Sequence, residues 1–321
     1  MTLTQLEAFV LVARLGSVTA AARTLGVSEP AVSGALASLR QQLGDNLVER
    51  GPQGMTLTPG GQRLVPIASQ MVALAAEAED AIRQVRGAPE RLRVVATSTV
   101  AESVGPALLA AFSARAAAVD VSLGVASTEE MPAVLQERLA DVALGPRLAG
   151  EGALGLESIP LLRYRLMIVA APSHRLAESS QVPVRALVGE TWLVDPEATD
   201  VASPVARMLH QLDVAERDVR VFASQAAAWD AAEQGQGVAP AVAHLVASEI
   251  GRGSLVGLDI EGMPVQLMWH ATMLSPDRRS AAAASLRQFM ATPDATHAMH
   301  APSRGVLPSR FRPPVYVTLW S

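Results

Sequence analysis

The hydrophobic positions at the start of the chain follow a helical repeat. Apolar side chains three or four residues apart lie on one face of a helix, and the first such series is Leu3, Leu6, Phe9, Val10 and Ala13. Gly16 suits the left-handed end of that helix, and Ser17 suits the cap of a second helix that ends before Gly26. Ser28 suits the cap of a third helix, with Pro30 in its first turn. The pattern predicts three short helices in succession.

The second and third of these helices have the spacing of a helix-turn-helix. Ala22 lies where two helices nearly touch, Gly26 tolerates positive φ in the turn, and Val32 anchors the following helix. Taken alone, this pattern also fits a three-helix scaffold without a role in DNA binding. Residues 44–61 then contain two β-prone stretches around a Gly/Pro/Gln turn, as a wing does, and Thr58 begins a long helix. The combination predicts a winged helix-turn-helix.

The run from Leu3 to Gly61 contains SEPAVSGALASLRQQLG, LVER and LTPGG in order and resembles the DNA-binding region of LysR-type transcriptional regulators. The resemblance implies that the third helix enters the major groove of promoter DNA. The residues that we expect at the DNA are Ser17, Ser28, Glu29, Pro30, Ala31, Ser33, Gly34, Arg50 and Thr58. Glu29, Gly34 and Arg40 depart from the family pattern, which changes the expected DNA sequence preference.

Simpler roles stay open for several of these residues. Ser28 also suits a position that only caps its helix, and Ser33 suits a solvated surface position. Arg50 is the strongest candidate for a phosphate contact, because its charge is fixed and its planar fork matches two oxygens. An exposed arginine without a partner is the alternative for Arg50.

Residues 62–87 carry a second, narrower apolar repeat. The apolar positions alternate in steps of three and four: Leu64, Ile67, Met71, Leu74, Ala78, Ala81 and Val85. This period is typical of a seam between two helices, whereas a helix packed on its own domain needs a broader stripe. We therefore expect a homodimer that pairs through this helix, and the family resemblance implies a homotetramer.

Beyond residue 90, buried-strand runs alternate with helical stretches. Strands are predicted at 92–97, 119–126 and 141–145, and the scheme restarts with strands at 191–195 and 220–224. Alternation of this kind predicts a mainly parallel α/β sheet. The motifs DVALGP, APSHRLA and GQGVAP are similar to the LysR effector domain, which implies two lobes of the type 2 periplasmic binding protein kind.

The expected fold class is thus α/β with an N-terminal all-α winged helix-turn-helix. The DNA-binding domain is expected at 1–61, a linker and dimerisation helix at 62–89, and the effector-binding domain at 90–292. Within the last of these, we place lobe I at 90–163 and 266–292 and lobe II at 164–265. Residues 293–321 form a tail that the family pattern does not cover.

A pair of hydroxyl residues follows each of the first two predicted strands. The carboxyl ends of parallel strands meet at the ligand-binding edge of such folds, where hydroxyls and free N–H groups hold anions. These residues also suit plain helix caps. The family resemblance adds three looser matches, so the expected effector-binding residues are Ser98, Thr99, Ser127, Thr128, Pro146, Val201 and Gln225. The expected effector is a small metabolite that bears a carboxylate or phosphate.

Charge and composition sharpen this picture. The chain has 26 basic residues, all of them Arg, against 31 acidic residues, and a net charge of −5 argues against nonspecific DNA binding. Residues 1–63, however, contain five Arg and four acidic residues, so the acidity lies in the later part of the chain. The absence of Cys excludes disulfides, thiolate nucleophiles and Cys-based zinc sites.

No motif indicates an enzyme. Gly150, Gly152 and Gly155 fit GxGxxG, but the strand-like LESIPLL follows instead of the helix that a pyrophosphate needs. We expect no catalytic residues, cofactor or metal. The absence of a signal peptide and of a long apolar run predicts a cytoplasmic protein without a membrane partner. We expect promoter DNA, a small-molecule effector and RNA polymerase as partners. The alternative is a binding protein or enzyme that shares only the two-lobed fold.

Overall fold

Three helices and a hairpin build the N-terminal part of the structure, which we call the head. The computed structural model describes residues 1–51 and 54–300 of the chain. The elements of the head are α1 (Leu3–Leu15), α2 (Val18–Leu25), α3 (Glu29–Leu43), β1 (Val48–Gly51) and β2 (Gly54–Leu57). The two strands pair antiparallel and form the wing. The expected winged helix-turn-helix is confirmed.

Local capping sets the helix ends of the head. The hydroxyl of Ser17 accepts a hydrogen bond from Ala20 N–H, and that of Ser28 accepts one from Ala31 N–H, as predicted. Gly16 ends α1 with φ of 60°, a left-handed conformation that glycine adopts without a steric penalty. The inner faces of the helices bury a common core that includes Leu6, Phe9, Val32, Leu36 and Leu39.

The long helix α4 (Pro59–Val85) begins against the base of the wing. Thr58 Oγ1 donates to Asp45 Oδ1 at 2.6 Å and accepts from Gly61 N–H at 3.0 Å. The bond from the Thr58 hydroxyl, together with one from Leu47 N–H, holds the pKa of Asp45 below its usual value. A Cβ atom on Gly61 would overlap the Leu47 carbonyl oxygen, so this approach requires glycine.

Gly61→Ala is therefore expected to destabilise the head by about 1–3 kcal/mol, because the Leu47 backbone must move to admit the methyl group. Gly34→Ala is the matched control. The position of a Cβ atom at Gly34 is open, and alanine favours a helix over glycine by about 1 kcal/mol. Thermal unfolding followed by circular dichroism should show a lower midpoint for the first variant and a higher one for the second. A wild-type midpoint for Gly61→Ala would contradict the close packing.

One face of helix α4 packs on the rest of the protein, and another face is exposed to solvent. The buried face includes Ala68, Ser69 and Ala73. Leu64 is half-buried against the core of the head, and the remaining positions of the predicted seam are exposed: Ile67, Met71, Leu74, Ala78, Ala81 and Val85. Val85 is 87% exposed, and Leu74 is 51% exposed. An apolar stripe of this kind is available for a second helix.

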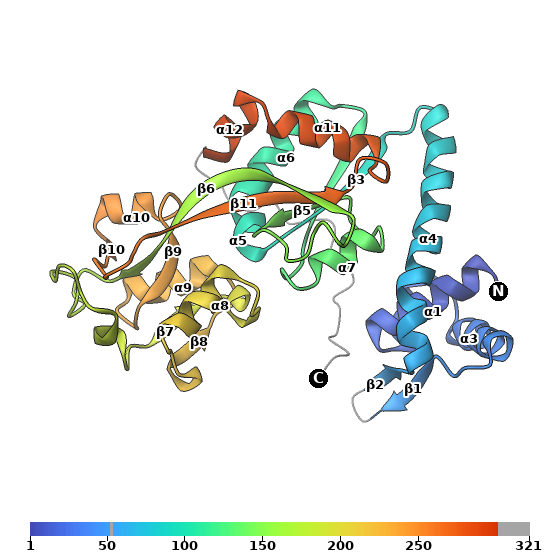
Figure 1. Ribbon diagram of the computed structural model, residues 1–321, viewed down its shortest axis with the longest axis horizontal. Coiled ribbons are helices and arrows are strands. Elements are labelled where there is room, and N and C mark those ends of the chain that lie inside the picture. Colours follow the sequence, from blue (N-terminus) through green and yellow to red (C-terminus); the bar gives the residue numbers. More distant parts are fainter. Residues whose placement is uncertain (52–53, 301–321) are drawn as a thin grey trace.

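Lobe I is a sheet with helices on its faces, in the middle of the molecule in Figure 1. Strand β3 pairs parallel with its two neighbours, β4 and β5. The elements that contribute to this lobe are β3 (Glu90–Ala96), α5 (Ser98–Glu102), α6 (Val104–Arg115), β4 (Val119–Val125), α7 (Met131–Gln136), β5 (Val142–Gly145), α11 (Ala281–Met290) and α12 (Pro293–His300).

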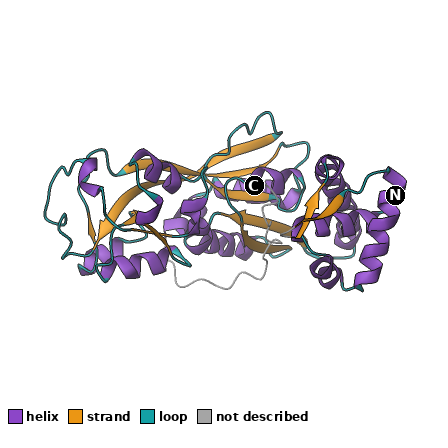
Figure 2. Ribbon diagram, turned by 90° about the horizontal axis from the view of Figure 1, so that it is seen from below, coloured by secondary structure: helices purple, strands orange, loops and turns teal. Residues whose placement is uncertain are grey.

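Lobe II lies at the far end of the molecule from the head (Figures 1 and 2). Its strands β7 and β8 pair parallel in a two-stranded sheet. Its elements are η1 (Val184–Leu187), β7 (Trp192–Val194), η2 (Pro196–Thr199), α8 (Pro204–Gln211), η3 (Glu216–Asp218), β8 (Val219–Val221), α9 (Gln225–Glu233), β9 (Ala239–Val242), α10 (Ala247–Arg252) and β10 (Val256–Gly257), where η marks a 3₁₀ helix.

Two long strands run through both lobes. Strands β6 (Leu156–Ala170) and β11 (Val265–Leu274) pair antiparallel with each other and arch from one lobe to the other in Figure 1. Their register shifts between Trp269 and His270. These strands join the seven-stranded sheet in the order β10-β6-β11-β5-β3-β4, with β9 on β6. The sheet is therefore mixed rather than mainly parallel as expected, because β11 pairs antiparallel with both β5 and β6.

The tail at 293–321, which the family pattern does not cover, begins with a helix. Helix α12 lies against α6, and Ala295 and Met299 are buried in the contact. Arg115 of α6 forms an ion pair with Asp294 at 2.5 Å. Residues 301–321 lie outside the described part of the chain. Among the described residues, every helix is too short or too polar to cross a bilayer.

Candidate DNA-binding and effector sites

The N-terminal half of α3 offers a free surface for DNA. Its predicted contact residues are all exposed: Ser28, Glu29, Pro30, Ala31, Ser33 and Gly34. The opposite side of the helix is held in the core of the head by Val32 and Leu36. Burial of one side and exposure of the other is the arrangement that a helix needs to lie in a major groove.

The other predicted DNA contacts differ in their surroundings. Ser17 is half-buried and caps α2. Thr58 is 9% exposed, and its hydroxyl is engaged by Asp45 and Gly61 N–H, which favours a capping role over a contact with DNA. The side chain of Arg50 lies outside the described residues, so its phosphate contact stays a prediction.

A buried ion pair connects the head to lobe I. Arg14 of α1 donates through Nη2 to Glu137 Oε2 at 2.6 Å and to Ser69 Oγ of α4 at 2.8 Å. Arg14 is 6% exposed, and Glu137, directly after α7, is 7% exposed. Arg138 pairs with Glu77 of α4 nearby. The orientation of the head relative to lobe I is therefore fixed by charge as well as by packing.

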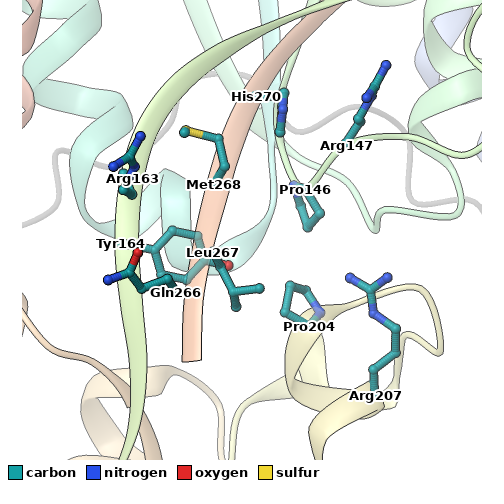
Figure 3. Close-up of a pocket in the computed structure, with 10 residues that line it drawn as sticks. All are labelled: Pro146, Arg147, Arg163, Tyr164, Pro204, Arg207, Gln266, Leu267, Met268 and His270. Carbon is teal, nitrogen blue, oxygen red and sulfur yellow. The ribbon is translucent and has the colours of Figure 1, made fainter. Parts of the chain in front are cut away.

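A cavity of about 400 Å³ lies between the lobes, where β6 and β11 cross from one to the other. Figure 3 shows its lining: Pro146 and Arg147 follow β5 of lobe I, Pro204 and Arg207 lie on α8 of lobe II, and the two long strands supply the rest. Those strand residues are Arg163, Tyr164, Gln266, Leu267, Met268 and His270. Of the predicted effector residues, Pro146 lines this cavity.

Three arginines line the cavity. Arg163 and Arg207 lie on opposite sides in Figure 3, and neither forms an ion pair with a residue that the structure describes. Arg147 contacts Glu151 through Nε at 2.9 Å. Burial lowers the pKa of His270, which favours the neutral form of its ring. Because the described lining contains three arginines and no carboxylate, its field favours an anion.

The predicted anion-binding residues lie at the interface of the two lobes, and they already have partners. Thr99 donates from Oγ1 to Glu197 Oε2 at 2.8 Å and from its backbone N–H at 3.3 Å. Thr128 donates from its backbone N–H to Asp200 Oδ2 at 2.6 Å. Thr99 and Thr128 belong to lobe I, and both carboxylates belong to lobe II, within a segment after β7 that we call the acidic segment (195–200).

Further carboxylates gather around Glu197. Burial and, secondarily, repulsion by Asp195 raise the pKa of Glu197 to about 7, against the hydrogen bonds from Thr99. Burial, followed by repulsion from Glu102, raises the pKa of Asp195 to about 6. Burial also raises the pKa of Glu102, although the backbone N–H of Gln225 lowers it in part. The lobe interface thus carries a concentration of negative charge.

The remaining predicted effector residues have varied environments. Ser127 bonds Glu130 through its N–H and hydroxyl, both at 2.9 Å, and so caps its own turn. Ser98 is half-buried, whereas Val201 is 76% exposed. Gln225 is buried at the start of α9, where its backbone N–H faces Glu102. The structure therefore brings Thr99, Thr128 and Gln225 to the lobe interface and leaves Val201 at the surface.

The sequence interpretation missed both the cationic lining of the cavity and the acidic segment. Arg163 lies within strand β6 and Arg207 lies on helix α8, and neither belongs to a sequence motif that would indicate a binding site. The acidic segment had a usable signal: DPEATD places three carboxylates directly after the buried strand β7. The rule that selected the hydroxyls after the first strands applies equally to residues after β7.

Comparison with known proteins covers most of the chain. Residues 3–62 match the family described as bacterial regulatory helix-turn-helix protein, lysR family, and residues 85–293 match the LysR substrate binding domain. The chain is 36% identical over 326 residues to the uncharacterized HTH-type transcriptional regulator Rv0377 of Mycobacterium tuberculosis (strain ATCC 25618 / H37Rv), with 100% of both proteins covered.

Solved structures share the fold. Full-length CbnR complexed with its target DNA matches with a TM-score of 0.61 and 21% identity, over 90% of this chain and 99% of CbnR. The regulatory domain of Synechocystis PCC6803 CcmR in complex with 2-PG matches with a TM-score of 0.54 and 26% identity, over 67% of this chain and 100% of that domain.

The head, the two-lobed domain and the similar proteins agree on one conclusion. The expected fold class is confirmed, and the similar proteins are named as transcriptional regulators rather than enzymes. The chain belongs to the LysR family and is a DNA-binding transcriptional regulator that responds to an effector.

Proposed function

We propose that the effector of this regulator is a small anion that binds in the cavity between the lobes. The observation that carries the proposal is the placement of Arg163 and Arg207 on opposite walls without an ion-pair partner among the described residues. Guanidinium groups suit carboxylate and phosphate because their paired N–H donors match two oxygens. The complex of the CcmR regulatory domain with 2-PG supports a small-molecule ligand for a domain of this fold.

The proposal extends to the residues beside the cavity. Thr99, Thr128 and Gln225 face the same cleft and become available to the effector when the lobes separate. Binding changes the separation of the lobes, because the effector has different affinities for the closed and open arrangements. Lobe I is attached to the head, so a change in the lobes is transmitted toward the DNA.

Substitution of Arg163 or Arg207 tests this site. Arg163→Gln and Arg207→Gln should each abolish the thermal shift that the wild-type protein shows with an active compound from a panel of small carboxylates and phosphate esters. Loss of the bidentate donor is expected to weaken binding at least tenfold. Arg165→Gln is the control, because Arg165 is exposed on the same strand and does not line the cavity. Unchanged binding in both test variants would place the effector elsewhere.

We also propose the contacts on the DNA side. The exposed residues of α3 reach base edges, Ser17 and Arg50 contact phosphates, and Thr58 supports the start of α4.

The exposed stripe of α4 pairs two chains into a homodimer, which matches a two-fold DNA site. Association into a homotetramer and contact with RNA polymerase in the cytoplasm complete the proposal. A mobility shift with the intergenic DNA upstream of the chain's own gene tests DNA binding.

A further inference from the structure

Two carboxylates of lobe II occupy positions in lobe I where an effector anion is expected. Glu197 receives both the hydroxyl and the backbone N–H of Thr99, and Asp200 receives the backbone N–H of Thr128. These donors are the groups that the sequence analysis assigns to a bound carboxylate or phosphate. The acidic segment therefore supplies, from within the chain, the chemical group that the cleft is built to hold.

Burial makes these contacts strong. Glu197 and Asp200 are each 9% exposed, Thr99 is 5% exposed and Thr128 is 4% exposed. Hydrogen bonds from N–H and O–H donors to a carboxyl oxygen are stronger where water is excluded. Because each contact joins lobe I to lobe II, both oppose separation of the lobes.

Among the described residues, polar atoms without partners and mutually repelling carboxyl groups lie beside these contacts. Thr128 Oγ1 and Asp195 Oδ2 are buried without a hydrogen-bond partner among the described residues. Glu102, Asp195 and Glu197 also repel one another. A buried polar group without a partner typically costs about 1–3 kcal/mol, so the closed interface is less stable than its contacts alone imply.

We propose that Glu197 and Asp200 act as an internal ligand that holds the cleft closed and competes with the effector for Thr99 and Thr128. This inference rests on the proposed function, since it places the effector in the same cleft. An effector that bears a carboxylate or phosphate replaces the side-chain carboxyl groups at these donors. Its apparent affinity is lowered by the fraction of molecules in which the internal ligand is in place.

Removal of one internal carboxylate provides the test, with acetate as the probe. Glu197→Ala vacates the position beside Thr99 without removing the donors. Saturating sodium acetate should then raise the Tm of Glu197→Ala by about 2–4 °C, because a ligand that binds only the folded state stabilises it. The wild-type protein should change by less than about 1 °C, because Glu197 already fills the position.

Three controls separate this effect from a general effect of salt. Sodium chloride at the same ionic strength should not reproduce the shift. Glu216→Ala, which removes an exposed carboxylate of η3, should behave as the wild-type protein. Glu197→Ala combined with Thr99→Val should lose most of the acetate effect, because the hydroxyl donor is gone. If Glu197→Ala does not fold, Asp200→Ala provides the same test at Thr128.

Defined outcomes decide the proposal. Equal stabilisation of the wild-type protein and Glu197→Ala by acetate would overturn it, as would a folded Glu197→Ala variant that acetate does not stabilise. Hydrogen exchange gives a second measurement: the Thr99 amide should exchange at least tenfold faster in Glu197→Ala without acetate and recover with it. The arginine variants test the effector site independently, because their cavity contacts do not include Thr99. The internal ligand can therefore fail while the cavity site survives.

Discussion

Glu137→Ala is expected to release the head from lobe I. The substitution removes the carboxylate that accepts from Arg14 at 2.6 Å, and the Arg14 guanidinium is 6% exposed in the wild-type protein. Breaking a buried ion pair by removal of one partner typically costs about 3–5 kcal/mol, because the remaining charge stays out of water. Separation of the two parts hydrates Arg14, so we expect undocking before global unfolding. Hydrogen exchange should become about 100-fold faster or more in α1 and α7 at their contact.

Two comparison variants identify the cause of that release. Glu77→Ala should have a much smaller effect, because the Glu77 side chain is 37% exposed and its pairing with Arg138 is partly screened by water. Arg14→Met combined with Glu137→Met should recover most of the docking, since an apolar pair has no charge to desolvate. Equal exchange rates at α1 and α7 in Glu137→Ala and wild-type protein would show that the ion pair does not hold the head.

Glu197→Gln is expected to stabilise the protein at pH 8 and to leave its stability nearly unchanged at pH 4. The amide retains an oxygen that accepts from Thr99 but carries no charge into the interface. The pKa of Glu197 is about 7 in the folded protein against 4.5 for an ordinary glutamate, a difference that corresponds to about 3 kcal/mol. Urea unfolding of the wild-type protein and the variant at several pH values measures the difference.

The direction of the pH dependence follows from proton binding. Between pH 4.5 and about 7, the folded protein retains a proton on Glu197 that the unfolded chain releases. Wild-type stability therefore falls as the pH rises through this range and is level above it. Asp195, whose pKa is raised to about 6, adds a fall of the same sign at slightly lower pH.

Several charged groups around Glu197 contribute to this behaviour. Glu102 of α5 and Asp195 at the start of η2 repel Glu197. The charge of Glu197 raises the pKa of Tyr164 of β6, and the charge of Arg207 lowers it. Glu216→Gln is the control, because Glu216 is exposed to solvent. A pH profile that is the same for Glu197→Gln and wild-type protein would contradict a protonated Glu197 in the closed cleft.

The head was predictable because its determinants are local. Caps such as Ser17 and Ser28, and the turn glycine Gly16, act within one helix end, so the sequence letters alone indicate them. The apolar repeat of α4 is equally local. The apolar side chains of this repeat beyond Leu64 are exposed in the structure, in agreement with the narrow stripe that the steps of three and four indicate. Short-range physics therefore determined the part of the chain that binds DNA.

The cleft was only partly predictable because its contacts join distant segments. Thr99 and Thr128 were found from their places after strands, but the partners Glu197 and Asp200 lie in another lobe. The pairing of Arg14 with Glu137 likewise depends on how two domains dock. The register of β6 on β11, which brings Arg163 and His270 to one cavity, depends on long-range strand pairing that periodicity does not encode.

The two strands that join the lobes also determine how the lobes can be separated by other means. Because β6 and β11 are hydrogen-bonded to each other, the connection between the lobes is a pair of strands and not an unpaired loop. A protease needs an extended, unpaired backbone, so it should cut between the head and lobe I, around residues 86–89, before it cuts between the lobes. Any change in the relative position of the lobes must therefore bend or twist this paired ribbon, which opposes the change.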